Sequence, residues 1–203
     1  QEKQMASGEQ ARQSTYWRNA LAGPLPVLEL QTDHPRPQQV SHRGDRQPIR
    51  IPGQLVNDLR RFGQEEGATI QMVLLSTVTT LLHRYTHQDD ILLGTAIQAR
   101  VRPEVERLIG VFVNTLALRT KPRSDMSFRQ LLRHVKEVSL GAFGHQDLPF
   151  DRVVEEVNPT RDPSRTPVYQ AMFSFQDASY RDTRMGELER SRVDVGTVVA
   201  PTD

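Results

Sequence analysis

The chain has 203 residues, of which 36% are hydrophobic and 25% charged, and its formal net charge is +1 at pH 7. This balance is typical of a globular protein with one domain or two small lobes. The sequence lacks the basic stripe of a nucleic-acid-binding protein. It also lacks any apolar run near the roughly 18 residues that span a bilayer. Because the chain has no cysteine, disulfides, thiolate metal sites and cysteine nucleophiles are excluded.

The first fifty residues predict a helix, a strap and an edge strand. The chain begins with neither an initiator Met nor a signal-peptide hydrophobic segment, so we expect it to be a piece of a longer protein. Residues 10–22 should form a short amphipathic helix anchored by Trp17. Prolines recur through residues 24–37, which favours an extended strap over the surface. Residues 40–51 are typical of a modest strand, and Pro48 places it at an edge or a break.

Two helices are expected next. Apolar residues recur at helical spacing from Leu55 to Phe62, and we expect Gly63 and Gly67 to end that helix. Residues 70–85 are apolar over most of the helix circumference, which indicates a helix buried in the core. Thr69 is a good candidate for the cap at its N-terminus.

Two buried strands follow, joined by a polar loop at residues 98–107. The first strand covers residues 91–97, and the second covers residues 108–119, a nearly unbroken apolar run rich in β-branched side chains. Asn114 is the polar exception in that run. A buried amide without partners costs about 1–3 kcal/mol, so Asn114 either ties down a neighbouring loop or faces a cavity in which a polar group of a substrate takes that place.

The remaining pattern is helix, helix and strand. Ser127 can cap a helix at residues 128–143, and Pro149 favours the start of a shorter helix at residues 150–157. Residues 168–176 alternate as a final strand. Helices interleaved with buried strands make this an α/β layer architecture.

Few side chains form a catalytic or metal-binding pattern. His83 and His87 have the spacing of a two-His metal site, but no third ligand follows at a recognisable distance, so we expect no metal. His145 lies between two predicted helices, where Asp147 can cap the helix that Pro149 starts and His145 can brace the turn, which favours a structural role over a catalytic one. There is no Gly-x-Ser-x-Gly elbow and no phosphate-binding glycine motif.

The stretch from Arg161 to Arg165 has two interpretations. Its two arginines could bind an anion, or an Arg–Asp contact could lock the turn before the last strand, which is the commoner outcome. From residue chemistry alone, the chain is therefore an α/β lobe with one unusual buried amide and no complete catalytic set.

Three stretches together resemble the condensation domains of nonribosomal peptide synthetases. They read Leu-Ile-Gly-Val-Phe-Val-Asn-Thr-Leu-Ala-Leu-Arg at 108–119, His-Gln-Asp-Leu-Pro-Phe-Asp at 145–151, and Arg-Asp-Pro-Ser-Arg-Thr-Pro-Val-Tyr-Gln at 161–170. They are similar to the last three signature motifs of that family, in the same order and at fitting intervals. The resemblance extends over residues 16 to 177.

The resemblance implies a fold and an activity. The family pairs two chloramphenicol-acetyltransferase-like lobes across a tunnel, where an amine on one phosphopantetheine arm attacks a thioester on another and forms a peptide bond. It implies a mixed sheet packed with helices, with residues 1–39 as an N-terminal helix and Pro-rich strap and residues 40–203 as the C-terminal lobe, truncated at its C-terminal end. The family's His-His-x-x-x-Asp-Gly motif is missing here, so no catalytic residue is expected in this chain.

The resemblance also implies roles for particular residues. We expect four residues to line the substrate tunnel: Asn114, Thr115, Gly94 and Arg100. We expect five to hold the lobe together: His145, Asp147, Pro149, Arg161 and Arg165. Two positions depart from the family pattern, Ala99 where glycine is usual and Asp151 where glutamate is common. Alanine tolerates a positive φ poorly, so the first departure puts the backbone freedom of the tunnel floor in question.

The expected partners are those of a synthetase module. They are the N-terminal condensation lobe, peptidyl carrier proteins and a neighbouring adenylation domain, with no nucleic acid and no membrane, in the cytoplasm. No cofactor is expected to bind this chain directly, because phosphopantetheine belongs to the carrier proteins. Two alternatives are a stand-alone lobe that binds carrier protein or pantetheine without chemistry, and part of an epimerisation or ester-forming relative.

Overall fold

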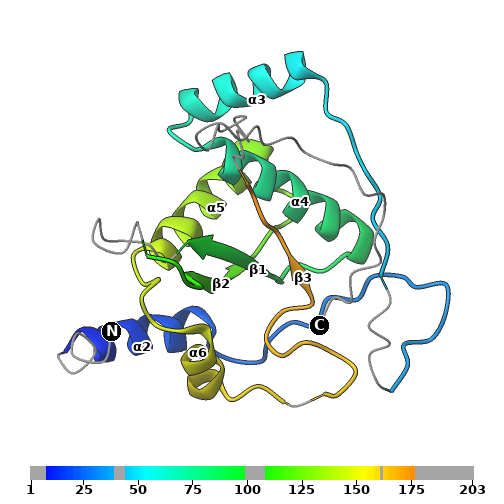
Figure 1. Ribbon diagram of the computed structural model, residues 1–203. Helices are drawn as coiled ribbons and strands as arrows, with labels where there is room; N and C mark the ends of the chain where they lie inside the picture. Colours follow the sequence, from blue (N-terminus) through cyan, green and yellow to red (C-terminus); the bar gives the residue numbers. More distant parts are fainter. Residues whose placement is uncertain (1–7, 39–43, 99–107, 161, 177–203) are drawn as a thin grey trace, which may run out of the picture.

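The computed structural model describes residues 8–38, 44–98, 108–160 and 162–176. Within them, helices cover a small mixed sheet (Figure 1). β1 lies between an antiparallel β2 and a parallel β3, so the strand order is β2-β1-β3. In chain order the elements are α2 (Glu9–Ala20), α3 (Gly53–Glu65), α4 (Ile70–Thr86), β1 (Ile91–Gln98), β2 (Val113–Thr120), α5 (Phe128–Phe143), α6 (Phe150–Val157) and β3 (Ala171–Met172).

The predicted helices form, and two begin with the expected caps. Thr69 accepts a hydrogen bond from the Met72 amide at 3.3 Å and starts α4. Ser127 and Gln130 form a reciprocal capping box at the start of α5. Gly63 does not end α3, since it lies buried inside the helix, and Gly67 with φ +60° follows its end. No helix in the described part of the chain is both long and apolar enough to cross a membrane.

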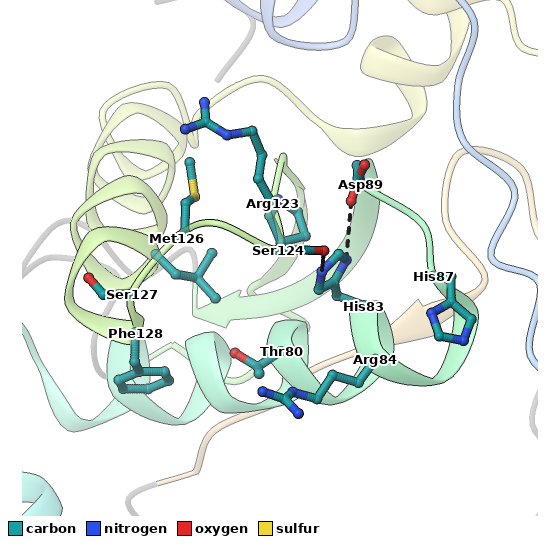
Figure 2. Close-up of a pocket in the computed structure, with 12 residues that line it drawn as sticks. Thr80, His83, Arg84, His87, Asp89, Arg123, Ser124, Met126, Ser127 and Phe128 are labelled. Atoms are coloured by element: carbon teal, nitrogen blue, oxygen red, sulfur yellow. Dashed lines mark hydrogen bonds and ion pairs between the residues drawn. The ribbon is translucent and has the colours of Figure 1, made fainter.

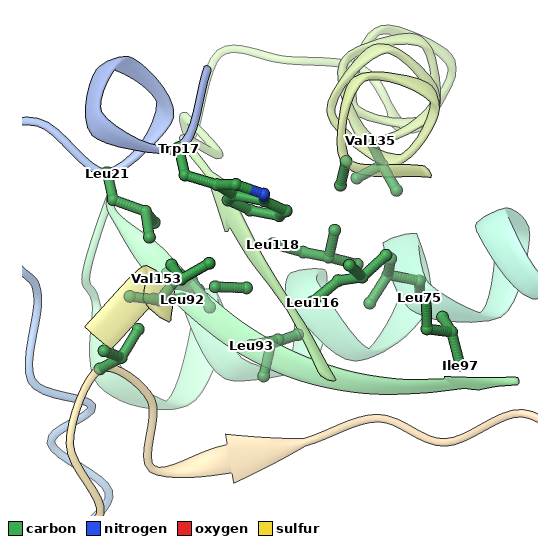
Figure 3. Packing of buried hydrophobic residues seen from close by; sticks show 14 of the residues in the cluster. Trp17, Leu21, Leu75, Leu92, Leu93, Ile97, Leu116, Leu118, Val135 and Val153 are labelled. Carbon is green, nitrogen blue, oxygen red and sulfur yellow. The ribbon is translucent and has the colours of Figure 1, made fainter. Parts of the chain in front are cut away.

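The core joins elements from both ends of the chain. Trp17 of α2 and Leu21 are each only 1% exposed, and they belong to the same cluster as Leu93, Leu116 and Leu118 of the sheet (Figure 3). In Figure 1, α3, α4 and α5 lie above the sheet, while α2 and α6 lie together below it. The N-terminal helix is therefore a structural part of the lobe, because its only tryptophan is buried in the common core.

Arg119 of β2 fastens the Pro-rich strap to the sheet. Its guanidinium binds both carboxylate oxygens of Asp90, with the shortest contact 2.6 Å, and also donates to the carbonyls of Ala22 at 2.7 Å and Pro24 at 2.8 Å. Residues 24–38 form neither helix nor strand, and most of them are exposed. The planar fork of arginine suits this site, because it satisfies a carboxylate and two backbone carbonyls at once.

Two strand predictions were too long, and the described part of a third forms no strand. The third was expected at residues 40–51, of which residues 44–51 form no strand and residues 40–43 lie outside the described residues. The run at 108–119 enters the sheet only at Val113, because its ladder with β1 ends where Gln98 pairs with Val113. The predicted strand at 168–176 is reduced to Ala171–Met172, which pair with β1, and Val168 has φ +72° and is not extended.

Candidate functional site

Asn114 uses its whole side-chain amide to hold the segment between α5 and α6. The Nδ2 group donates to the carbonyls of Gln146 at 2.8 Å and Leu148 at 2.9 Å. The Oδ1 atom accepts from the Phe150 amide at 3.0 Å and from the Thr115 amide at 2.9 Å. All four hydrogen-bonding positions of the amide are therefore occupied, and the first of the two interpretations from the sequence, a tie to a neighbouring loop, is what these contacts form.

The position of Asn114 explains this function. β2 is an edge strand within the described sheet, and Asn114 pairs with Ile97 near its beginning. Helix α6 has Pro149 at its N-cap and no cap from a neighbouring side chain. The first amides of a helix lack internal partners, so Asn114 supplies from a distant strand the acceptor that the local sequence does not.

Asp147 does not cap α6, which corrects the expectation from the sequence. Its side chain is exposed, and the N-terminus of α6 receives no hydrogen bond from it. Pro149 lies at the N-cap of the helix, one residue before its first turn, with φ −57° and ψ 141°. An aspartate must lie at the N-cap itself to reach the amides of the first turn, and Asp147 lies two residues earlier.

Gly94 and Thr115, both expected to line the tunnel, lie beneath Tyr169. A Cβ atom added at Gly94 would lie 2.6 Å from two carbons of the Tyr169 ring. Thr115 is a hydrogen-bond partner of the Tyr169 hydroxyl, and burial raises the pKa of that phenol, an effect that the Thr115 contact partly offsets. Tyr169 also packs against Phe150, with ring centroids 5.5 Å apart. Sequence reasoning treated Tyr169 only as part of the last strand and missed this role.

His145 joins the end of α5 to α2. Its Nδ1 lies 2.8 Å from the Gly141 carbonyl oxygen and therefore carries the proton, so Nε2 accepts from Arg12 Nη1 at 2.8 Å. The ring stacks flat on Tyr16, with centroids 3.9 Å apart and an interplanar angle of 1°. The indole of Trp17 donates to the His145 carbonyl at 2.9 Å. These contacts tie the end of α5 to α2.

The third motif forms a local turn. Asp162 accepts two hydrogen bonds from Ser164, which hold the pKa of the Asp162 carboxyl below its usual range. Arg165 Nε lies 3.5 Å from the Asp162 carboxylate, so an Arg–Asp contact spans the turn. Arg161, like Arg100 and Ala99, lies outside the described residues.

A separate hollow of about 580 Å³ lies between α4 and the β2–α5 turn (Figure 2). Along it, Ser124 Oγ, His83 Nε2 and Asp89 follow one another, with both contacts 3.4 Å long. His83 Nδ1, however, is closer to the Gln88 carbonyl at 2.9 Å, and the Asp89 side chain is 70% exposed. Because Nδ1 is bonded to the Gln88 carbonyl rather than oriented by Asp89, the geometry is that of a histidine at a helix end.

Within the part of the chain that the structure describes, the residues around Asn114 form a hydrogen-bonded network without a reactive group. Among the described residues, no three His, Cys, Asp or Glu side chains lie together as metal ligands would. The amide of Asn114 is consumed by the backbone of residues 146–150, and Gly94 is covered by an aromatic ring. This arrangement can hold the shape of a surface, but it offers no nucleophile paired with a base.

Comparisons with known proteins agree on one family. The family model described as "Condensation domain" matches residues 1–203. Surfactin synthase subunit 1 of Bacillus subtilis (strain 168) is 41% identical over 203 residues, which cover 100% of this chain and 6% of that protein. Bacitracin synthase 3 of Bacillus licheniformis is 43% identical over 177 residues, 87% of this chain and 3% of that protein. The chain thus spans less than a tenth of the length of these relatives.

Solved structures give the same fold. Holo-AB3403, a four-domain nonribosomal peptide synthetase, matches with a TM-score of 0.80 and 27% identity over 87% of this chain and 14% of that one. The X-domain from teicoplanin biosynthesis matches with a TM-score of 0.75 and 29% identity over 84% of this chain and 38% of that one. The mixed sheet packed with helices, and with it the chloramphenicol-acetyltransferase-like lobe expected from the resemblance, is confirmed.

Proposed function

This chain belongs to the condensation-domain family, and we propose that it supplies one wall of the tunnel in which a nonribosomal peptide synthetase forms a peptide bond. In that reaction an amine on one phosphopantetheine arm attacks the thioester carbonyl on another. A C–N bond forms, the C–S bond breaks, and the thiol leaves with a proton. The chain contains no His-His pair, so a base for this step must come from the rest of the domain.

The observation that carries the proposal is the fixed position of Asn114. Three of its hydrogen bonds reach residues 146–150, so they tie β2 to the start of α6. Condensation of two tethered substrates depends on holding the amine and the thioester carbonyl in the correct relative position. Such proximity and orientation can lower an activation barrier by several kcal/mol, up to roughly 7–11. A wall held this firmly suits positioning better than proton transfer. We propose that Asn114, Thr115, Gly94 and Arg100 belong to it.

Exposed apolar side chains next to Asn114 favour a contact with the rest of the domain. Ile109, Val111 and Val113 are 104%, 93% and 61% exposed. They alternate along the segment that leads into β2, so in an extended backbone they share one face. Apolar surface of this kind marks an interaction site. We propose that the N-terminal lobe covers it, and that carrier proteins and an adenylation domain are further neighbours in a cytoplasmic module.

The test is a condensation assay in the complete synthetase module. We expect the 203-residue chain alone to form no amide bond between two carrier-bound aminoacyl thioesters. In the module, Asn114→Ala should lower the rate of dipeptidyl thioester formation while the loading of both carrier proteins stays normal. An isolated chain that joins the two residues unaided, or an Asn114→Ala module with the normal rate, would overturn the proposal.

A second candidate is a binding lobe without chemistry. It is favoured by the X-domain of teicoplanin biosynthesis, which matches this chain at 29% identity and has also been solved in complex with OxyB. In this case the module would bind its carrier protein with normal affinity and still form no amide bond. The condensation assay therefore separates the two candidates.

A further inference from the structure

The wall around Asn114 is connected to α2 by a continuous series of contacts. The two carbonyls that accept from Asn114 belong to Gln146 and Leu148. His145 directly precedes them, and it is held on three sides: by Gly141 in α5, by Arg12, and by the indole of Trp17, which donates to the His145 carbonyl. Gly141 and Arg12 contact the two nitrogens of the imidazole ring. A fourth contact, the stack with Tyr16, covers one face of that ring.

Tyr16 contacts the rings of both His145 and Trp17. Its ring lies parallel to the His145 ring at 3.9 Å, with an interplanar angle of 1°. It also packs edge-on against Trp17, at a centroid distance of 5.0 Å. Burial raises the pKa of its phenol. One flat face of the imidazole is thus covered by a half-buried ring that packs against the core.

The backbone of α5 is shaped to admit this ring. A Cβ atom added at Gly141 would lie 2.7 Å from the Tyr16 hydroxyl oxygen and 3.2 Å from its ring. Glycine is a poor helix former, and Gly141 lies inside α5. Its place there fits the close approach of Tyr16, because any side chain at position 141 would require the Tyr16 ring to shift.

We infer that Tyr16 is a positioning residue for the proposed condensation reaction, acting through His145 on the backbone that holds Asn114. This inference rests on the proposed function of the Asn114 wall. Stacking by Tyr16 keeps the imidazole between Gly141 and Arg12. The position of His145 then determines the backbone path of residues 146–148, which follow α5. The carbonyls of those residues then meet the amide of Asn114. Tyr16 lies far along the sequence from every signature motif and touches none of the proposed tunnel-lining residues in the described contacts.

The test uses four variants of the complete module. Tyr16→Leu removes the stack, and Gly141→Ala displaces the ring although alanine favours the helix. Gly144→Ala is the matched control, because a Cβ there meets its nearest neighbour at 3.4 Å, an ordinary contact. In the double variant Gly141→Ala with Tyr16→Phe, loss of the hydroxyl removes the closest clash, so we expect partial rescue.

The first readout is independent of activity. Hydrogen–deuterium exchange of peptides spanning residues 146–152 should speed up roughly five- to tenfold in Tyr16→Leu and Gly141→Ala, because the Phe150 amide loses its steady acceptor. Peptides from β1 and β2 should keep their protection, which shows that the lobe is folded. Unchanged exchange at 146–152 in both variants would overturn the inference.

The second readout is the rate of dipeptidyl thioester formation. We expect kcat to fall by roughly tenfold in the same two variants, with the KM for the acceptor carrier protein unchanged, since orientation is lost rather than binding. A rise in KM with constant kcat would overturn the positioning role. If the unaltered module forms no amide bond, the proposed function fails, while the exchange experiment still decides the coupling between Tyr16 and the Asn114 loop.

Discussion

Asn114 caps a helix that begins 36 residues further along the chain, through a 3.0 Å hydrogen bond from the Phe150 amide to its Oδ1 atom. The same side chain donates to two carbonyls of the turn that precedes the helix. One amide thus satisfies a helix N-terminus and a turn together. This contact explains why a polar residue interrupts an apolar strand. At Asn114 the strand lies against the backbone of residues 146–150, and an apolar side chain there would leave those backbone groups unpaired.

Replacement of Asn114 should be costly in proportion to the hydrogen bonds lost. Asn114→Ala removes every contact and should lower the free energy of unfolding of the condensation domain by about 1–3 kcal/mol. Asn114→Asp keeps the acceptor for Phe150 but cannot donate to Gln146 and Leu148, so it should also destabilise. Urea unfolding measures both. Asn57→Ala, at an exposed position of α3, is the control, and equal stability of all three variants would contradict the prediction.

Gly94→Ala should destabilise through a clash with Tyr169. The new Cβ would lie 2.6 Å from the ring, and overpacking of this kind costs about 1–3 kcal/mol. On a Tyr169→Ala background the same change should cost much less, because the clashing ring is gone. Thermal unfolding of the four proteins completes the cycle, with Gly53→Ala as control, since a Cβ there meets nothing within 4 Å. Additive effects would exclude the contact as the cause.

Arg119→Lys should loosen the strap although it keeps the charge. Lysine can replace only part of the fork that binds Asp90 and the carbonyls of Ala22 and Pro24. The carbonyls of Ala22 and Pro24 are exposed and can be hydrated, so each lost hydrogen bond should cost about 0.5–1.5 kcal/mol in urea unfolding. Limited proteolysis should cut the strap sooner than in the parent protein. Arg133→Lys, at an exposed position of α5, should change neither measurement.

Glu9 should titrate far below an ordinary glutamate. Hydrogen bonds from Arg12 lower the pKa of Glu9 from 4.5 to about 2. Because the folded pKa is the lower one, the stabilisation is complete above pH 4.5 and is lost as the pH falls towards 2. NMR titration of the Glu9 carboxylate should place its midpoint near 2, and Arg12→Gln should move it back towards 4.5. A midpoint unchanged by this substitution would rule out the Glu9–Arg12 pair as the cause of the lowered pKa.

The isolated 203-residue chain should associate or bind hydrophobic dyes. Its exposed row of Ile109, Val111 and Val113 has the apolar character of an interface. Changing all three to serine should reduce dye binding and shift sedimentation towards monomer. Leu140→Ser, at a 55% exposed site on α5, should have little effect. A monomer of the unaltered chain with a sharp cooperative melt and no dye binding would contradict the prediction.

Local patterns were enough to predict the helices and β1. Apolar spacing together with Thr69 and Ser127 placed α4 and α5 to within about a residue, because a helix satisfies its own backbone hydrogen bonds and needs only a nearby cap. Strands do not. Residues 108–112 have the composition of a strand, yet within the described residues the ladder with β1 begins only at Val113.

The candidate site likewise combines features that the sequence predicted with contacts that only the structure showed. The residue types alone identified Asn114 as unusual, and the order of three motifs placed the chain in its family, because an amide within an apolar run and a motif are both properties of the sequence itself. In the structure Asn114 is half-buried. Only the tertiary structure showed that Asn114, rather than Asp147, caps α6, and that Tyr169 covers Gly94 while Tyr16 stacks on His145. Those contacts join residues that are tens to more than a hundred positions apart, and the fold alone determines which distant side chain reaches an unpaired backbone group first.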